Sequence, residues 1–297
     1  MVAEDVSGGY AVLNNNEKLP LVGFGTYKIA TQDEVNTAVD AALSSGYRMF
    51  DTAKYYNNED FLGHALKEYL PRYNLKREDI FITTKTFPDR DDTFENGKNH
   101  VLKSLKDLQT EYIDLYLIHY PKSDFRENDD PMNAYNRKEL YLALVASQKA
   151  GLIKSIGVSN YEVRHLREIP SYSDVVPAVN QLEFHPLFTR NDIREYCKQH
   201  NIFFQAFSSL ARFHEDVIKN DVIVKMAEKY SVTVPILLLA FAVCQNVGII
   251  PKSSSPARIK ENFKVVDVKI SKEDIRKLMD LDTGKHYIRC TPWLVTA

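Results

Sequence analysis

Three reactive side chains each stand at the end of a run rich in apolar residues. They are Asp51, Lys85 and His119, and Tyr55 and Tyr56 follow Asp51 closely. Free tyrosine titrates near pH ~10, and a neighbouring ammonium group lowers the pKa of the phenol because it favours the tyrosinate. A tyrosine beside a lysine, an aspartate and a histidine can therefore give a proton to a carbonyl oxygen, or take one from an alcohol. The residue types predict acid and base chemistry, provided that the fold brings them together.

The runs that carry these side chains belong to a regular alternation along the chain. Short runs rich in Val, Ile, Phe and Tyr predict strands at 21–26, 48–51, 80–85, 113–119, 153–158, 178–184, 202–206 and 247–251. Amphipathic segments between them predict helices at 31–43, 59–69, 94–108, 137–150, 163–168, 190–200, 217–227, 234–244 and 271–281. This alternation indicates a parallel sheet with right-handed crossovers.

The length of the chain indicates how such a sheet closes. A chain of 297 residues suits an α/β fold of the (β/α)8 TIM barrel type, which we predict to form one domain over residues 1–297. An open doubly wound sheet is the alternative. In a barrel, catalytic groups come from the carboxyl ends of the strands, so Asp51, Lys85 and His119 are expected to face one mouth.

Three segments stand outside the alternation. Residues 10–19, around three consecutive asparagines, predict an N-terminal β-hairpin that caps one end of the barrel. Residues 286–297 form a C-terminal tail that includes Tyr287 and Trp293, and we predict that this tail is a substrate loop. The polar stretch 121–136 predicts a further loop.

The charge balance and the cysteine content limit the classes of protein to which the chain can belong. Lys plus Arg is 38 and Asp plus Glu is 40, a formal net charge of −2, whereas nucleic-acid binders usually carry a basic excess. The longest apolar run, 234–244, is too short to span a bilayer of roughly 30 Å. Three widely separated cysteines, and an N-terminus without the features of a signal peptide, predict reduced thiols in the cytoplasm. Histidines and carboxylates do not fall at metal-ligand spacing, so no metal site is predicted.

A basic segment near the C-terminus has the composition of a phosphate site. Lys252 and Arg258 supply two cations, Ser253 and Ser255 supply hydroxyl groups, and a helix is predicted to begin near Pro256. A helix N-terminus with an arginine beside it binds phosphate well. An added arginine is also typical of sites for the 2′-phosphate of NADP. Taken alone, the segment is better interpreted as a solvated basic turn with ordinary helix caps.

Six ordered blocks of sequence resemble the aldo-keto reductase family. The blocks are GYRMFDTA at 46–53 with YNNE at 56–59, TTK at 83–85, DLYLIH at 114–119, GVSN at 157–160, NQ at 180–181, and IPKSSS at 250–255 with RIKEN at 258–262. The resemblance extends from Val12 to about Thr283. It implies a (β/α)8 barrel and an NADPH-dependent oxidoreductase that reduces aldehydes and ketones to alcohols.

The resemblance also implies a catalytic tetrad of Asp51, Tyr56, Lys85 and His119. The family spacing selects Tyr56 over Tyr55 as the proton donor, and Tyr55 is expected to pack in its loop. In this scheme Lys85 lowers the pKa of Tyr56, Asp51 holds Lys85 in place, and His119 orients the carbonyl group. Steroid double-bond reductases of the family have Glu at the position of His119, so ordinary carbonyl reduction is expected here.

The binding site for NADPH follows from the same resemblance. Ser159, Asn160 and Gln181 correspond to contacts of the nicotinamide carboxamide, and Phe207 to the residue that stacks on the nicotinamide ring. The adenosine end corresponds to the basic segment near the C-terminus. The predicted cofactor residues are Gly25, Thr26, Tyr27, Asp51, Ser159, Asn160, Gln181, Phe207, Ser208, Leu210, Lys252, Ser253, Ser254, Arg258, Glu261 and Asn262.

Aromatic residues that depart from the common family pattern predict the substrate pocket. These are Tyr27 and Tyr120, together with Tyr287 and Trp293 of the tail. We expect a small carbonyl substrate, no nucleic-acid or membrane partner, and a monomer. His185 follows a predicted strand and could also be catalytic, although a structural role is preferred.

Two other functions are compatible with parts of this pattern. The first is a non-catalytic redox sensor, a regulatory subunit that binds NADPH, because binding subunits of this superfamily keep the tetrad motifs. The second is a metal-dependent barrel hydrolase. That class needs carboxylates and histidines clustered at strand ends, and the sequence does not have them.

Overall fold

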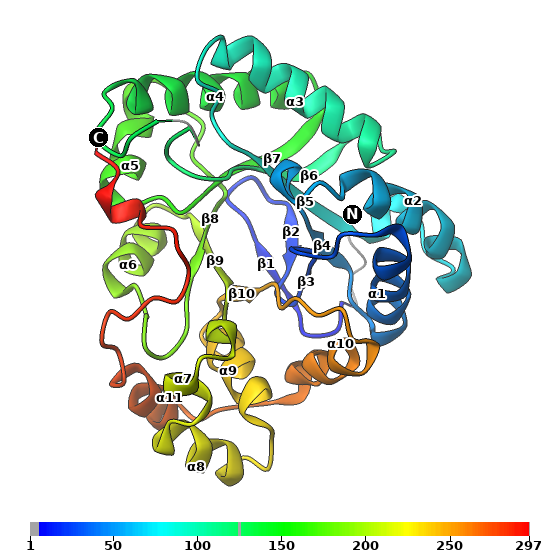
Figure 1. Cartoon of the computed structure of the whole chain (residues 1–297), viewed down its shortest axis with the longest axis vertical. Coiled ribbons are helices and arrows are strands. Elements are labelled where there is room, and N and C mark those ends of the chain that lie inside the picture. The colour runs from blue at the N-terminus through cyan, green and yellow to red at the C-terminus, as the bar shows by residue number, and fades with distance from the viewer. Residues whose placement is uncertain (1–5, 124–125, 297) are drawn as a thin grey trace.

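The computed structural model describes residues 6–123 and 126–296, and its eight parallel strands form a barrel surrounded by helices (Figure 1). Neighbouring strands follow one another in sequence, so every connection is a local crossover. The strands are β3 (Phe24–Gly25), β4 (Met49–Asp51), β5 (Phe81–Thr86), β6 (Ile113–Ile118), β7 (Ile153–Ser159), β8 (Val179–Glu183), β9 (Phe203–Phe207) and β10 (Gly248–Ile249). All eight predicted strands are confirmed.

Backbone contacts between the first and last strands close the barrel. Val22 bridges Ile249, and Gly25 bridges Lys252, both in the parallel sense. Gly25 is required at this seam because a Cβ atom there would lie 2.7 Å from the carbonyl oxygen of Ile250. The open doubly wound alternative is therefore excluded, and the (β/α)8 prediction is confirmed.

The helices cover the outside of the barrel. They are α1 (Gln32–Ser45), α2 (Glu59–Tyr69), α3 (Thr93–Asp107), α4 (Met132–Lys149), α5 (Val163–Glu168), α6 (Asn191–Gln199), α7 (Glu215–Ile218), α8 (Asp221–Lys229), α9 (Val234–Val243), α10 (Pro256–Phe263) and α11 (Lys272–Met279). The bounds predicted for α2 and α5 agree with those in the structure. A helix at Pro256 was also predicted and is present.

Two predicted element boundaries are wrong, both for local reasons. The loop predicted at 121–136 is shorter in the structure, because α4 already begins at Met132. The backbone N–H group of Met132 donates a hydrogen bond to Oδ1 of Asp130 at 2.8 Å, which caps the start of the helix. The predicted helix 217–227 is two helices, α7 and α8. The side chain of Asn220 accepts hydrogen bonds from the backbone N–H groups of Val222 and Ile223, and this N-cap starts a new helix.

The N-terminal hairpin closes the end of the barrel at which the parallel strands begin, as predicted. Its strands β1 (Tyr10–Val12) and β2 (Lys18–Pro20) are antiparallel. Leu13 and Leu19 of the hairpin are buried in one cluster with Met49, Phe81 and other side chains of the barrel interior. The apolar hairpin therefore excludes water from that end, and the polar groups of the strands collect at the opposite mouth.

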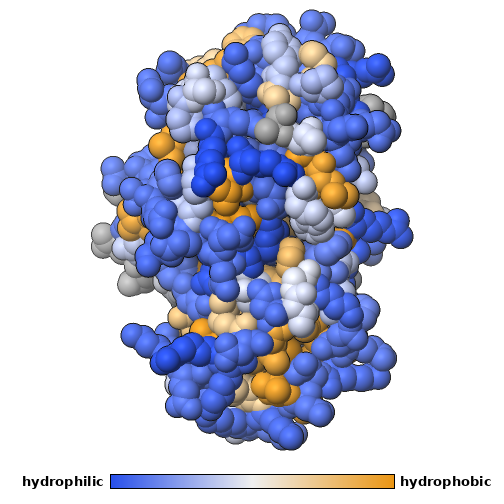
Figure 2. All heavy atoms as spheres, turned by 90° about the vertical axis from the view of Figure 1, so that its left-hand side faces the viewer, coloured by the Kyte–Doolittle hydropathy of each residue, from blue (hydrophilic) through white to orange (hydrophobic). Residues whose placement is uncertain are grey.

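The face of the molecule shown in Figure 2 is mostly hydrophilic. Figure 2 shows the side of the barrel that carries α5, α6 and the C-terminal tail, where smaller apolar patches lie between polar residues. Within the described ranges, no single helix is long and apolar enough to span a membrane. Helices α8 and α9 together reach that length and composition, but they are bent by 85° at their junction.

Candidate active site

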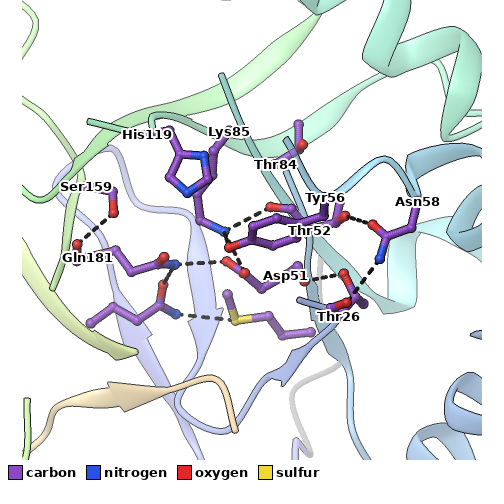
Figure 3. A network of polar contacts seen from close by, with 12 residues as sticks. Thr26, Asp51, Thr52, Tyr56, Asn58, Thr84, Lys85, His119, Ser159 and Gln181 are labelled. Carbon is purple, nitrogen blue, oxygen red and sulfur yellow. Dashed lines mark hydrogen bonds and ion pairs between the residues drawn. The ribbon is translucent and has the colours of Figure 1, made fainter. Parts of the chain in front are cut away.

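The period of two along each strand carries the polar side chains to the barrel mouth. On β4, Met49 points into the apolar interior, and Asp51, two residues later, lies one layer nearer the mouth. On β5 the same side of the strand presents Lys85. Beyond the end of β6, His119 follows Leu117 in the same alternation. Figure 3 shows these side chains converging from neighbouring strands.

A buried ion pair organises the centre of this cluster. The Nζ atom of Lys85 lies 2.6 Å from Oδ1 of Asp51, 2.9 Å from the carbonyl oxygen of Thr52 and 3.4 Å from Oη of Tyr56. Asp51 and Lys85 are 1% and 0% exposed. The Lys85 ammonium group therefore has three oxygen partners, and Figure 3 shows Asp51, Thr52 and Tyr56 gathered around it.

Burial controls the protonation of the three groups. It raises the pKa of Asp51, against the opposing effects of Lys85 and the hydrogen bond from Gln181. It lowers the pKa of Lys85, opposed by Asp51. It also raises the pKa of Tyr56 well above its usual range, and the charge of Asp51 adds to the rise. Burial therefore dominates the pKa of Tyr56 in this structure, so the phenol keeps its proton at neutral pH, and the lowering effect expected of Lys85 stays a prediction.

The loop that carries Tyr56 is fixed by amide and hydroxyl contacts. Tyr56 ends a short 3-10 helix, η1 (Lys54–Tyr56), directly after β4. Asn58 accepts a hydrogen bond from the Thr52 hydroxyl at 2.7 Å and donates to the carbonyl oxygens of Thr26 and Ile29. Asn58 is completely buried, so the turn is anchored to the barrel rather than free to move with solvent. The sequence motif contained Asn58, but its anchoring role was not predicted.

His119 is held by aromatic rings. Phe87 stacks on it with a centroid separation of 4.6 Å, and the ring of Tyr56 is edge-on to it at 5.7 Å. Burial, with the charge of Lys85, lowers the pKa of His119 well below 6.5, so the imidazole is neutral. Its Nδ1 atom has no hydrogen-bond partner within residues 6–123 and 126–296. A neutral imidazole with one donor and one acceptor can hydrogen-bond a carbonyl or hydroxyl oxygen.

Tyr55 and Phe87 are neighbours of His119 that the sequence interpretation did not place in the site. Tyr55 is 57% exposed and lies edge-on to Phe87 at 5.6 Å and to His119 at 6.3 Å. Phe87 follows Lys85 by two residues and so continues the same side of the strand. That period of two is the signal that could have identified Phe87.

Three predicted contacts of the nicotinamide amide lie around the Asp51 carboxylate. Gln181 donates through Nε2 to Oδ2 of Asp51 at 2.8 Å and to Oε1 of Gln205 at 2.8 Å. The Ser159 hydroxyl donates to the carbonyl oxygen of Gln181, and Asn160 donates to that of His119. Gln181 and Asn160 are therefore hydrogen-bonded to the tetrad residues Asp51 and His119, and Ser159 is connected to them through Gln181. Gln205 was not predicted, although it lies two residues before Phe207 on β9.

The predicted phosphate residues line a separate cavity of about 230 Å³. It combines the loop after β9 with the segment between β10 and α10, which are far apart in sequence. Its lining residues are Leu210, Phe213, Pro235, Lys252, Ser253, Ser254, Arg258, Glu261 and Asn262. Phe213 and Pro235 were not predicted. Two cations, two serine hydroxyls and the N-terminus of α10 make this cavity suitable for an anion.

The predicted substrate-pocket aromatics divide into two groups. Tyr27 lies next to the ring of Tyr56, at a centroid separation of 5.0 Å, and Tyr120 is buried beside His119 in the chain. Among the described ring contacts, Tyr287 packs on His185 and His214 instead. Trp293 likewise packs on His286 and Phe188. A direct substrate contact of these two tail residues therefore stays a prediction.

Some predicted cofactor residues already make contacts within the protein. The hydroxyl group of Thr26 donates to the carbonyl oxygen of Asp51 at 3.0 Å, and Gly25 is part of the barrel seam. Ser208 lies just beyond Phe207 with a left-handed backbone, φ 51°. Over the part of the chain that the structure describes, groups of three or more His, Cys, Asp or Glu suited to a metal ion are absent.

Comparisons with known proteins agree with this geometry. The model of the aldo/keto reductase family matches residues 21–283. Aldose reductase B of Dictyostelium discoideum is 36% identical over 290 residues, covering 92% of each chain. Methylglyoxal reductase DkgA of Escherichia coli O157:H7 is 36% identical over 273 residues, covering 92% of this chain and 93% of its own. An aldo/keto reductase from Brucella melitensis has a similar crystal structure, with a TM-score of 0.82 and 33% identity over 92% of this chain and 99% of its own.

Proposed function

Because the chain belongs to the aldo/keto reductase family, we propose that it reduces aldehydes and ketones to alcohols with NADPH, and that Tyr56 is the proton donor. The observation that carries the proposal is the position of the Tyr56 hydroxyl group. It lies 3.4 Å from Lys85, close to His119, at the carboxyl ends of the barrel strands. Active sites of (β/α)8 barrels are formed at this end.

The four central residues have separate roles in the proposal. The substrate carbonyl oxygen lies between Tyr56 and His119, accepts a hydrogen bond from each, and takes the phenolic proton of Tyr56. The raised pKa of Tyr56 keeps that proton in place until the oxygen gains charge. The Lys85 ammonium group then stabilises the tyrosinate that is formed, and Asp51 holds Lys85 within reach.

The residues present fit a bound NADPH. The cavity with Lys252 and Arg258 would hold the adenosine 2′-phosphate, and Ser159, Asn160 and Gln181 lie close to the tetrad, where the nicotinamide amide would bind. We assign the remaining residues of the predicted cofactor set, which extends from Gly25 to Asn262, to the same NADPH site. When bound, NADPH supplies the hydride. All other steps of the proposal use side chains of this protein.

The names of similar proteins suggest which substrates to test first. One relative is an aldose reductase and another is a methylglyoxal reductase. We propose small aldehydes and dicarbonyl compounds as the first substrates of this protein. We further propose that the chain acts as a single domain, as a monomer, and in the cytoplasm.

The direct test is NADPH oxidation, followed by the loss of absorbance at about 340 nm, with a panel of aldehydes, ketones and dicarbonyls and with NADH in parallel. Consumption of NADPH that depends on substrate supports the proposal. Tight NADPH binding without turnover on any substrate would favour the redox-sensor alternative. No binding of either nucleotide would contradict both functions.

Arg258→Ala tests the assignment of the phosphate cavity. Arg258 lines that cavity, and its guanidinium group can donate two parallel hydrogen bonds to the 2′-phosphate. We expect the Kd for NADPH to rise about 10- to 100-fold, since a charge-assisted pair of hydrogen bonds contributes about 1.5–3 kcal/mol. The Kd for NADH, which lacks this phosphate, is expected to change less than about threefold. Nucleotide titration monitored by fluorescence measures both constants.

Lys260→Ala is the matched control, because Lys260 is on the same helix, is exposed and carries the same charge. It does not line the cavity. A general loss of positive charge would weaken NADPH binding equally in both variants, and that result would contradict a specific phosphate contact at Arg258.

A further inference from the structure

A second carboxylate lies near the mouth of the barrel, outside the tetrad. Glu183 ends β8 two residues after Gln181, so both side chains are on the same side of that strand. Glu183 is 1% exposed. Its Oε1 atom accepts a hydrogen bond from the backbone N–H group of Tyr287 at 2.8 Å, and it lies 3.2 Å from Nε2 of His185. A buried carboxylate of the barrel therefore holds the main chain of the C-terminal tail.

Contacts around this bond attach the first part of the tail to the loop after β8. The N–H groups of Thr283 and Lys285 both donate to the carbonyl oxygen of Leu187. The ring of Tyr287 lies 5.4 Å from that of His185, which is itself completely buried. The bond to Glu183 is the last of this series along the chain and the one made by a buried charge.

The last part of the tail is attached independently, to α4 and α5. Arg164 and His165 belong to α5, and they bind the carbonyl oxygens of Trp293 and Val295. Arg137 of α4 donates to the carbonyl oxygen of Thr296. Residues 288–291 therefore lie between two attachment sites, one on β8 and its loop, the other on α4 and α5.

The segment between the attachment sites lies against the proposed active site. Hydrogen bonds with Thr291 partly offset the burial that raises the pKa of Tyr120, which directly follows His119. The attachment point Glu183 lies one layer beyond Gln181 on β8, and the side chain of Gln181 donates to the Asp51 carboxylate at 2.8 Å. We therefore expect the path of residues 288–291 to limit the space beside the Tyr56 hydroxyl group.

We propose that Glu183 is a positioning residue that sets substrate range, by fixing the point at which the C-terminal tail starts across the barrel mouth. This inference rests on the proposed carbonyl reductase function. A carboxylate is a stronger acceptor for a backbone N–H group than a neutral oxygen, and its burial shields the bond from water. His185 donates to the same oxygen and keeps the carboxylate turned toward the tail.

Three variants separate the hydrogen bond from the bulk of the side chain. Glu183→Leu removes the acceptor and keeps a side chain of similar length. Glu183→Gln keeps a carbonyl oxygen as acceptor and is the matched conservative variant. Tyr287→Pro removes the N–H donor from the tail side, and with it the Tyr287 ring that packs on His185 and His214. Tyr287→Ala removes the ring but keeps the donor and is its control, so the difference between the two tests the bond even if Glu183→Leu does not fold.

The readout that does not depend on activity is the fluorescence of Trp293, because this tail residue is the only tryptophan of the chain. It packs on His286 and Phe188. In Glu183→Leu and Tyr287→Pro we expect acrylamide quenching of Trp293 to increase at least twofold, with emission shifted to the red. Glu183→Gln is expected to resemble the unchanged protein.

The kinetic readout compares a small with a large substrate. In Glu183→Leu we expect KM for a bulky aromatic aldehyde to rise about 5- to 10-fold. For methylglyoxal, kcat and KM are expected to stay within about twofold, and so is the Kd for NADPH. Glu183→Gln should restore the KM of the bulky substrate.

Unchanged quenching in both Glu183→Leu and Tyr287→Pro would overturn the inference. Increased quenching with an unchanged ratio of the two KM values would overturn the role in substrate range. If no form of the protein, including the unchanged one, reduces any carbonyl compound, the proposed function fails and the role in substrate range fails with it. An increase in quenching would then still establish Glu183 as the attachment point of the tail.

Discussion

Tyr56→Phe is expected to lower kcat for carbonyl reduction about 10³-fold, within the ~10²–10⁴-fold range that a positioned general acid supplies. The ring and its contacts with Tyr27 and His119 remain, so only the proton donor is lost. NADPH binding is expected to stay within about twofold. The measurements are steady-state NADPH oxidation and a nucleotide titration of the same preparation.

Tyr55→Phe is the matched control for this prediction. Tyr55 is the preceding residue, and its variant loses the same hydroxyl group. The Tyr55 side chain is exposed, however, and its ring contacts Phe87 and His119. We expect kcat to fall less than about threefold. If both variants lost activity equally, or if Tyr56→Phe kept full turnover, Tyr56 would not be the proton donor.

Lys85→Met is expected to destabilise the protein by about 3–5 kcal/mol, because it leaves the Asp51 carboxylate buried without its counter-charge. Activity should also be lost, since the substitution removes the ammonium group 3.4 Å from the Tyr56 hydroxyl. The free energy of unfolding in urea, measured by circular dichroism, tests the first effect, and NADPH oxidation tests the second.

Two further variants show whether burial is the cause. Lys103→Met breaks the ion pair between the exposed Lys103 and Asp107, whose N–O separation of 2.7 Å is similar, and solvent-screened pairs of this kind contribute little to stability. Asp51→Asn combined with Lys85→Met removes both charges and is expected to recover most of the stability without activity. Equal destabilisation by Lys85→Met and Lys103→Met would refute the argument from burial.

The fold could be predicted from the sequence because its signals are local. Each strand is a short apolar run, and each helix has its own period, so the number and order of the elements follow directly. The errors are also local. At Asn220, a single capping side chain divides one predicted helix into two, and at Met132 a helix starts within a polar stretch. Hydrophobic periodicity does not register such capping contacts.

The candidate site could be predicted only in part. Asp51, Lys85 and His119 were found because each ends an apolar run, and the family resemblance selected Tyr56. Phe87 continues the period of two on β5 and could have been found in the same way. The same period places Glu183 on the side of Gln181, but its bond to the tail could not be predicted, since the partner is a backbone N–H group more than one hundred residues away and no side-chain pattern marks that donor.

By itself, the sequence determined which residue types reach the barrel mouth, because the alternation along each strand depends on the chain alone. The tertiary structure decided their protonation and their neighbours. Tyr56 has the Lys85 ammonium group 3.4 Å from its hydroxyl group, yet its pKa is raised, because the phenol is buried and the Asp51 carboxylate is near. Burial depends on how all eight strands and the tail close around the site, and that closure is set by contacts between segments distant in sequence.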